Sequence, residues 1–157
     1  MANHVISNHT VMSRKTRQSA WFVTDEGVPL RKIYLSSNLN ATRELDDKYI
    51  NMLGQAIIDD DGIPSSIESE YDEYAMAEEH GELKYTNNED LIFSIVRDYD
   101  TDNLFVTRAI KLAVRDNKPH MESALTELLW FNNVQIRELQ ELIGHSEREG
   151  LDDEDDE

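Results

Sequence analysis

Hydrophobic residues recur every three or four positions over most of the chain after residue 40, which is the spacing of a helix with one buried face. A separate helix is expected from Ser65, because a serine followed three residues later by Glu68 forms a capping box. The pattern predicts five further helices, over 40–57, 89–97 and 103–116, from Pro119 onward, and over 134–145.

The pattern differs before residue 40. Residues 1–18 are polar, include three basic side chains and show no period, so they are expected to form a flexible basic arm. Two short runs, Ser19–Thr24 and Arg31–Ser37, are rich in β-forming residues and are separated by the turn-forming stretch DEGVPL. This arrangement predicts a β-hairpin over residues 19–37.

These elements predict an α+β fold, predominantly α, with an N-terminal β-hairpin packed on a bundle of about five or six helices. A length of 157 residues suits one globular domain. The expected organisation is a flexible arm (1–18), a single domain (19–146, with the hairpin at 19–37 and helices over 40–146) and a disordered acidic tail (147–157).

The net charge of −18 changes what partners are expected. The first 43 residues carry six Lys/Arg against two Asp/Glu, a net of +4, so the remaining residues carry −22. A field this negative repels nucleic acid and anionic membranes, so we expect a basic protein as partner, no direct nucleic acid and no membrane. The absence of cysteine and of a signal peptide favours a cytoplasmic location.

Two stretches partly match a calcium loop. Asp98–Asn103 alternates oxygen ligands as an EF-hand does, but Ala109 stands where the bidentate glutamate is required. The segment IIDDDGIPSSIE places Gly62 and Glu68 correctly, but it begins with Ile57 instead of a carboxylate. Both stretches are also explained as a helix cap and a helix end.

Other catalytic and metal-binding patterns are weak. Glu82 and Lys84 have the acid-x-Lys spacing of some nucleases, but they lie between predicted helices. The five histidines include no pair at the spacing of a zinc site. We therefore predict no catalytic residue, no cofactor and no metal site, and a protein that is not an enzyme.

The most acidic stretch, Asp59–Glu82, holds ten carboxylates and no Lys or Arg. On its predicted helix the carboxylates are spaced by about 3.7 Å, close to the roughly 3.4 Å between phosphates along one DNA strand. A soluble surface would intersperse both signs of charge, so these groups are expected to bind a partner. The predicted partner-binding residues are Asp59, Asp60, Asp61, Glu68, Glu70, Asp72, Glu73, Glu78 and Glu79.

In composition the chain resembles phage-encoded DNA mimics, which are small acidic helical proteins that occupy the DNA sites of restriction or transcription enzymes. The resemblance implies a non-enzymatic inhibitor or modulator of a basic nucleic-acid-binding protein in the host cytoplasm. Three alternatives remain open: a viral assembly, scaffold or chaperone protein that self-associates, with a possible homodimer; a degenerate EF-hand-like calcium-binding protein; and an acidic face that is only solvated.

Overall fold

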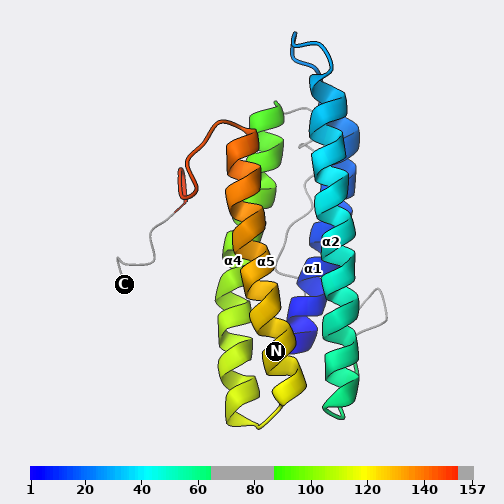
Figure 1. The fold of residues 1–157 in the computed structure, drawn as a ribbon, viewed down its shortest axis with the longest axis vertical. Coiled ribbons are helices and arrows are strands. Elements are labelled where there is room, and N and C mark those ends of the chain that lie inside the picture. Colours follow the sequence, from blue (N-terminus) through cyan, green and yellow to red (C-terminus); the bar gives the residue numbers. More distant parts are fainter. Residues whose placement is uncertain (65–86, 152–157) are drawn as a thin grey trace.

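The described part of the protein consists of four long helices. The computed structural model describes residues 1–64 and 87–151, and within these ranges it contains no β-strand. The helices are α1 (Ala2–Phe22), α2 (Arg31–Asp59), α4 (Asn88–Arg115) and α5 (Pro119–Leu142), drawn in Figure 1.

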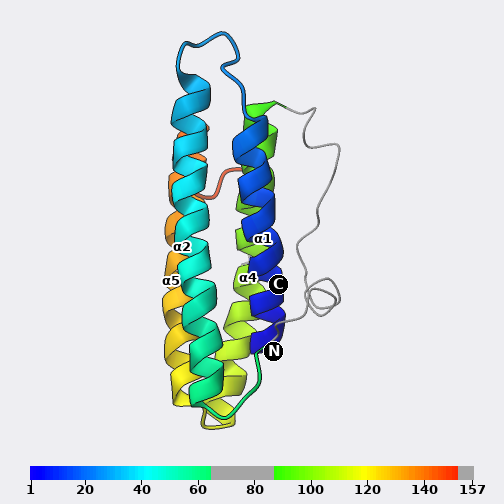
Figure 2. The same cartoon turned by 90° about the vertical axis from the view of Figure 1, so that its right-hand side faces the viewer.

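The four helices form one bundle. Figures 1 and 2 show α1 and α5 running in one direction and α2 and α4 in the other. The packed pairs are α1 with α2, α2 with α5, α5 with α4, and α4 with α1, so every helix is antiparallel to both of its neighbours. Because α2 and α4 run in the same direction, the end of α2 and the start of α4 lie at opposite ends of the bundle. A bundle of this kind has one long crossover connection.

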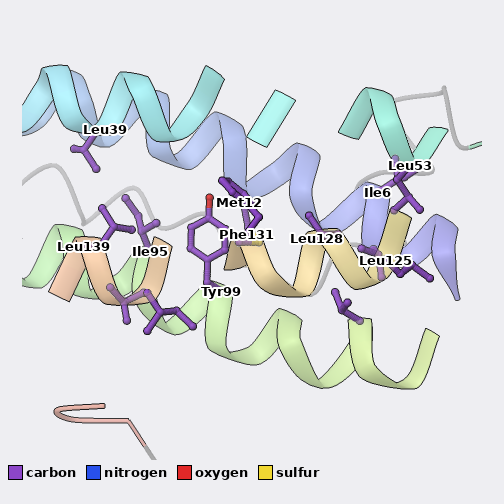
Figure 3. Packing of buried hydrophobic residues seen from close by; sticks show 14 of the residues in the cluster. Ile6, Met12, Leu39, Leu53, Ile95, Tyr99, Leu125, Leu128, Phe131 and Leu139 are labelled. Atoms are coloured by element: carbon purple, nitrogen blue, oxygen red, sulfur yellow. The ribbon is translucent and has the colours of Figure 1, made fainter. Parts of the chain in front are cut away.

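Apolar side chains from all four helices form one continuous core. Figure 3 shows Tyr99, Phe131 and Met12 grouped midway along the bundle, with aliphatic residues toward both ends. The ring of Phe131 stacks on Tyr49 at 4.5 Å between centroids and meets Tyr99 edge-on at 6.0 Å. These aromatic contacts join α2, α4 and α5 in the middle of the core.

Helix α1 covers the residues for which the sequence predicts a flexible basic arm (1–18). It begins at Ala2, and more than half of its buried side chains are polar: Ser7, Asn8, His9, Ser13, Lys15, Thr16 and Ser19. A helix whose inward face is largely polar shows no hydrophobic period. The sequence pattern therefore gave no sign of this helix.

The predicted β-hairpin over 19–37, and with it the α+β fold, is wrong. Its first run holds the last turn of α1, which ends at Phe22, and the two residues after it; its second run begins α2. Lys32 Nζ donates to the carbonyl oxygens of Trp21 (2.8 Å) and Val23 (2.9 Å) and so satisfies the end of α1. The intervening turn was predicted correctly, but it joins two helices, because packing in the bundle overrides β-propensity.

Several predicted helices merge. The helices expected over 89–97 and 103–116 form the single helix α4, and those expected from Pro119 and over 134–145 fall largely within α5. Asp98–Asn103 is therefore helical and not a calcium loop.

The helix predicted from Ser65 lies outside the described residues. Of the predicted acidic tail, residues 147–151 are described, and Arg148 Nη1 donates to Asp100 Oδ1 of α4 at 2.7 Å.

The fold makes a direct prediction for α4. Leu91 is 1% exposed and Leu104 is 45% exposed on the same helix. Leu91→Ala is expected to lower the free energy of unfolding by about 2–5 kcal/mol, because it leaves a cavity in the core. Leu104→Ala is the matched control and is expected to cost well under 1 kcal/mol in urea unfolding followed by circular dichroism. Equal losses in the two variants would contradict this packing.

Candidate functional site

Each helix of the bundle places one buried polar side chain at the same level of the core. These four residues are His9 on α1, Asp46 on α2, Asp102 on α4 and Asn132 on α5, and we call them the central cluster. All four are at most 1% exposed. The cluster is therefore closed to solvent within a core that is otherwise largely apolar.

The imidazole ring of His9 lies between two carboxylates. His9 Nδ1 lies 2.5 Å from Asp46 Oδ1, and His9 Nε2 is in hydrogen-bond contact with Asp102 Oδ2. An ionised carboxylate only accepts, so two ionised carboxylates at these positions require a proton on each ring nitrogen, which is the imidazolium form. This one side chain links α1 to both α2 and α4.

Amide groups complete the surroundings of Asp102. Asn132 Nδ2 donates to Asp102 Oδ2 and Asn8 Nδ2 donates to Asp102 Oδ1, both at 2.8 Å. Asp102 thus accepts hydrogen bonds from α1 twice and from α5 once. A buried carboxylate that accepts several hydrogen bonds is compensated for its loss of water.

The carboxylates control the protonation of His9. Burial alone lowers the pKa of His9, but the negative charges of Asp102 and Asp46 and their hydrogen bonds raise it to about 10. Burial raises the pKa of Asp46, and the charge of His9 opposes that effect. Burial also raises the pKa of the Tyr99 hydroxyl well above its ordinary value, with Asp46 and Asp102 adding to the shift. His9 is therefore protonated at neutral pH.

Two further buried hydrogen bonds join pairs of helices outside the central cluster. Lys15 Nζ donates to Asp98 Oδ2 at 2.8 Å and joins α1 to α4. Thr42 Oγ1 donates to Gln135 Oε1 at 2.8 Å and joins α2 to α5. Hydrogen bonds of this kind have few alternative partners in a core, so together they fix how far each helix is advanced along its neighbours.

The central cluster can hold a proton, but it cannot reach a substrate. Its members have nearly no exposed surface, and both nitrogens of His9 are occupied by Asp46 and Asp102. A general base needs a free position within hydrogen-bond reach of the group it deprotonates. The arrangement therefore supports a structural role.

Of the nine predicted partner-binding residues, three lie within the described part of the chain, at the end of α2. Asp59 ends α2, Asp60 caps it and Asp61 follows. Asp60 is 7% exposed; its Oδ1 accepts from His120 Nδ1 and its Oδ2 accepts from the backbone N–H of Met121, both at 2.8 Å. Although burial raises the pKa of Asp60, these hydrogen bonds lower it below its ordinary value. Asp60 thus ties α2 to α5.

The other six predicted partner-binding residues, Glu68, Glu70, Asp72, Glu73, Glu78 and Glu79, lie outside the described residues. The structure brings together a different set, the central cluster, which the sequence did not single out. A polar residue inside an apolar stripe was the available signal: Asp102 stands between Tyr99 and Val106, and Asn132 follows Phe131. His9 had the same signal in a weaker form: Ile6 and Met12, three positions to either side, are apolar and buried, but the adjacent Asn8 and Thr10 are polar and obscure the stripe.

Comparison with solved structures identifies bundles of the same shape. No family model and no curated protein matches the chain. The DpsB protein of Lactococcus lactis is 26% identical over 93% of this chain and 84% of its own, with a TM-score of 0.83. Dps from Listeria monocytogenes is 17% identical over 94% of both chains, with a TM-score of 0.84. Dps from Listeria innocua, in a zinc-soaked crystal, is 18% identical over 94% of this chain and 97% of its own, with a TM-score of 0.83.

These likenesses correct the functional expectations. The similar proteins are Dps proteins, which are ferritin-like and named for DNA protection, so the prediction of a phage-type DNA-mimic inhibitor is wrong. The alternatives of a viral scaffold and an EF-hand-like protein are not favoured either. The expected partners (a basic protein, no direct nucleic acid and a possible homodimer) are corrected by the same finding. Among the described helices, none is long and apolar enough to cross a membrane.

The central cluster does not fit a metal centre. Ferritin-like bundles build their metal sites in the core from glutamates and from Glu-x-x-His pairs on facing helices. Here each nitrogen of His9 points at a carboxylate instead of sharing an ion with it. The described residues contain no group of three His, Cys, Asp or Glu arranged to hold a metal ion.

The protonation of His9 makes stability depend on pH. Because the pKa is raised from 6.5 to about 10, the folded state binds more protons than the unfolded state between these values. The contribution is fully present below pH 6.5, and the free energy of unfolding is expected to fall, by an amount on the order of several kcal/mol, as pH rises toward 10.

Two variants test whether His9 causes this pH dependence of stability, which is measured by urea unfolding between pH 7 and 9.5. Asp46→Asn removes one of the two charges that raise the pKa of His9, so its loss of stability is expected to be smaller and to occur at lower pH. Asp47→Asn is the control, because Asp47 hydrogen-bonds Ser13 and Arg43 instead of His9. If the free energy of unfolding varied with pH in the same way in the wild type and in Asp46→Asn, the assignment of His9 as an imidazolium would be contradicted.

Proposed function

We propose that the chain is a ferritin-like subunit that self-assembles and sequesters metal cations, with a bundle interior that serves stability instead of metal oxidation. The observation that carries the proposal is the central cluster, in a fold shared with Dps proteins over more than nine-tenths of the chain. The central cluster is closed to solvent, and both nitrogens of His9 face carboxylates, so we place the functional chemistry on the surface.

Exposed apolar side chains support self-assembly. Six of the thirteen large apolar side chains exposed on the described residues lie within the fourteen positions from Trp21 to Tyr34: Trp21, Phe22, Val28, Leu30, Ile33 and Tyr34. We call Trp21–Tyr34 the apolar segment. Concentrations of exposed apolar surface are typical of interfaces between proteins. Copies of one chain usually associate with closed symmetry, which buries the same segment on every subunit.

The charge supports a cationic cargo. At −18 per chain, an assembly of several copies creates a strong negative field that concentrates cations around it. Ferrous iron is the first candidate because the fold is ferritin-like. The absence of cysteine in the sequence fits storage in a reducing cytoplasm, which is the location we propose.

Self-assembly is tested by changing the apolar segment. Leu30 and Ile33 are 71% and 66% exposed, so Leu30→Glu with Ile33→Glu is expected to keep the fold but to break the assembly through charge repulsion. Sedimentation velocity should show the wild type larger than a dimer and the double variant smaller. Trp130→Glu, at a 65% exposed position on α5, is the control and should leave the mass unchanged. A monomeric wild type would refute self-assembly.

Cation storage is tested by loading the assembled protein with ferrous iron and measuring the iron that remains after gel filtration. The wild type is expected to retain iron, and Asp46→Asn is expected to retain the same amount, because the central cluster does not hold the cargo. Iron oxidation in air should also proceed equally in the two proteins. Loss of retention or of oxidation in Asp46→Asn alone would place the metal chemistry at the cluster and overturn the proposal.

A further inference from the structure

A cavity lies between the last turns of α2 and the first turns of α5, toward the lower end of the bundle in Figure 1. It encloses about 320 Å³, within the range of about 300–1,000 Å³ that is typical of small-molecule sites. We call it the α2–α5 groove. Its lining combines the apolar Met52, Ala56 and Ala124 with the ionisable Asp59, His120 and Glu127.

The α2–α5 groove is separate from the apolar segment that we propose as the assembly interface. Helix α2 begins within the apolar segment and ends at Asp59, which lines the groove, so the two features lie toward opposite ends of the bundle (Figure 1). A helix of 29 residues is about 43 Å long. Asp59 and Glu127 are both exposed, so the groove is open to a solute.

Glu127 gives one end of the groove a negative charge without a counterion. Its carboxylate forms no hydrogen bond or ion pair with any residue in the ranges 1–64 and 87–151. It lies close to α2, because its charge adds to the effect of burial in raising the pKa of the Tyr49 hydroxyl. An unpaired carboxylate at the edge of a cavity attracts a cation.

Asp59, at the other end of the groove, also has no ion pair with a described residue. Its Oδ1 accepts from Gln55 Nε2 at 2.9 Å, and an amide does not neutralise a charge. His120 is bound to Asp60 instead, at 2.8 Å, and this hydrogen bond raises the pKa of the imidazole. Lys118 Nζ donates to the backbone carbonyl of Asp60 at 3.0 Å and does not line the groove. The groove thus has one carboxylate without an ion pair at each end.

The two carboxylates are separated by an apolar stretch of the lining. Asp59 is adjacent to Asp60, the partner of His120, so it lies near the level of His120. Glu127 follows His120 by seven positions, which is about 10 Å along the helix at roughly 1.5 Å per residue. Ala124 stands between these two levels. A ligand that reaches both carboxylates therefore crosses apolar surface.

We propose that the α2–α5 groove binds a short aliphatic diamine such as putrescine, with one ammonium group on Glu127, the other on Asp59 and the methylene chain on the apolar lining. Each ammonium group donates charge-assisted hydrogen bonds of about 2.8 Å to its carboxylate. The methylene groups and the apolar lining both lose contact with water, which is favourable. An inorganic cation satisfies the carboxylates but leaves the apolar lining uncovered, so the lining selects an organic ligand.

Binding is measured by nuclear magnetic resonance on the full-length protein with labelled methyl groups, titrated with putrescine at low salt. The methyl signals of Met52 and Ala124 are expected to shift and to saturate, whereas that of Met12, buried in the middle of the core, is expected to stay unchanged. Butylamine has the same chain with one ammonium group and should bind more weakly. Magnesium has the same charge as putrescine without a chain and should leave the Met52 and Ala124 signals in place.

Variants locate the site. Glu127→Gln is expected to weaken putrescine binding about fivefold, because one ammonium group loses its ion pair at an exposed position. Asp59→Asn is expected to remove the difference between putrescine and butylamine, since the second ammonium group then has no carboxylate. Glu138→Gln is the matched control, with the same change of charge on α5 outside the groove, and should bind as the wild type does. All three positions are exposed, so the variants are expected to fold normally.

Four outcomes would overturn the proposal: no saturable shift of the Met52 and Ala124 signals, equal putrescine affinity in the wild type and Glu127→Gln, the same weakening in Glu138→Gln, or the same shifts with magnesium. The inference goes beyond self-assembly and metal storage and does not depend on them. Iron retention by Glu127→Gln, measured in parallel, keeps the two apart, because a putrescine defect with unchanged iron retention concerns the groove alone.

Discussion

The bundle depends on a buried positive charge shared by two negative ones. The ring of His9 binds Asp46 on α2 and Asp102 on α4, and Asn132 on α5 binds the same Asp102, so each helix has one fixed position relative to the others. Burying three ionisable groups costs several kcal/mol per ion, and their attraction repays it only with close contacts. Apolar packing tolerates a shift of one turn along a neighbouring helix, but this cluster does not. Its contribution is therefore the choice of one register.

The burial of the central cluster is the reason that we propose surface chemistry for the protein. The four side chains are at most 1% exposed, so a substrate in solution does not reach them, and the proposed chemistry uses exposed features. These are the apolar segment for self-assembly and the overall negative charge for cations. The two are distinct in charge and in residue type. One bundle can therefore carry them together without rearrangement of its core.

The sequence predicted the parts of the fold in which hydrophobic spacing and burial coincide. The apolar stripes of α4 and α5 and the second half of α2 indicated helices at the right places, because their buried positions are mostly apolar. Helix α1 was missed because its buried face carries Asn8, His9 and Thr16, and the β-forming residues at its end suggested a strand. The central cluster was missed for a related reason: it is assembled from single residues of four helices, and no local spacing connects His9 to a carboxylate ninety-three positions away.

The protonation of His9 is the central claim, and nuclear magnetic resonance of the nitrogen-labelled protein measures it directly. The two ring nitrogens of an imidazolium have similar chemical shifts, whereas those of a neutral ring differ widely. We expect His9 to show the doubly protonated pattern at pH 7.5 and to lose it only as the pH approaches about 10. A neutral ring at pH 7.5, or a titration near the ordinary value of 6.5, would contradict the account.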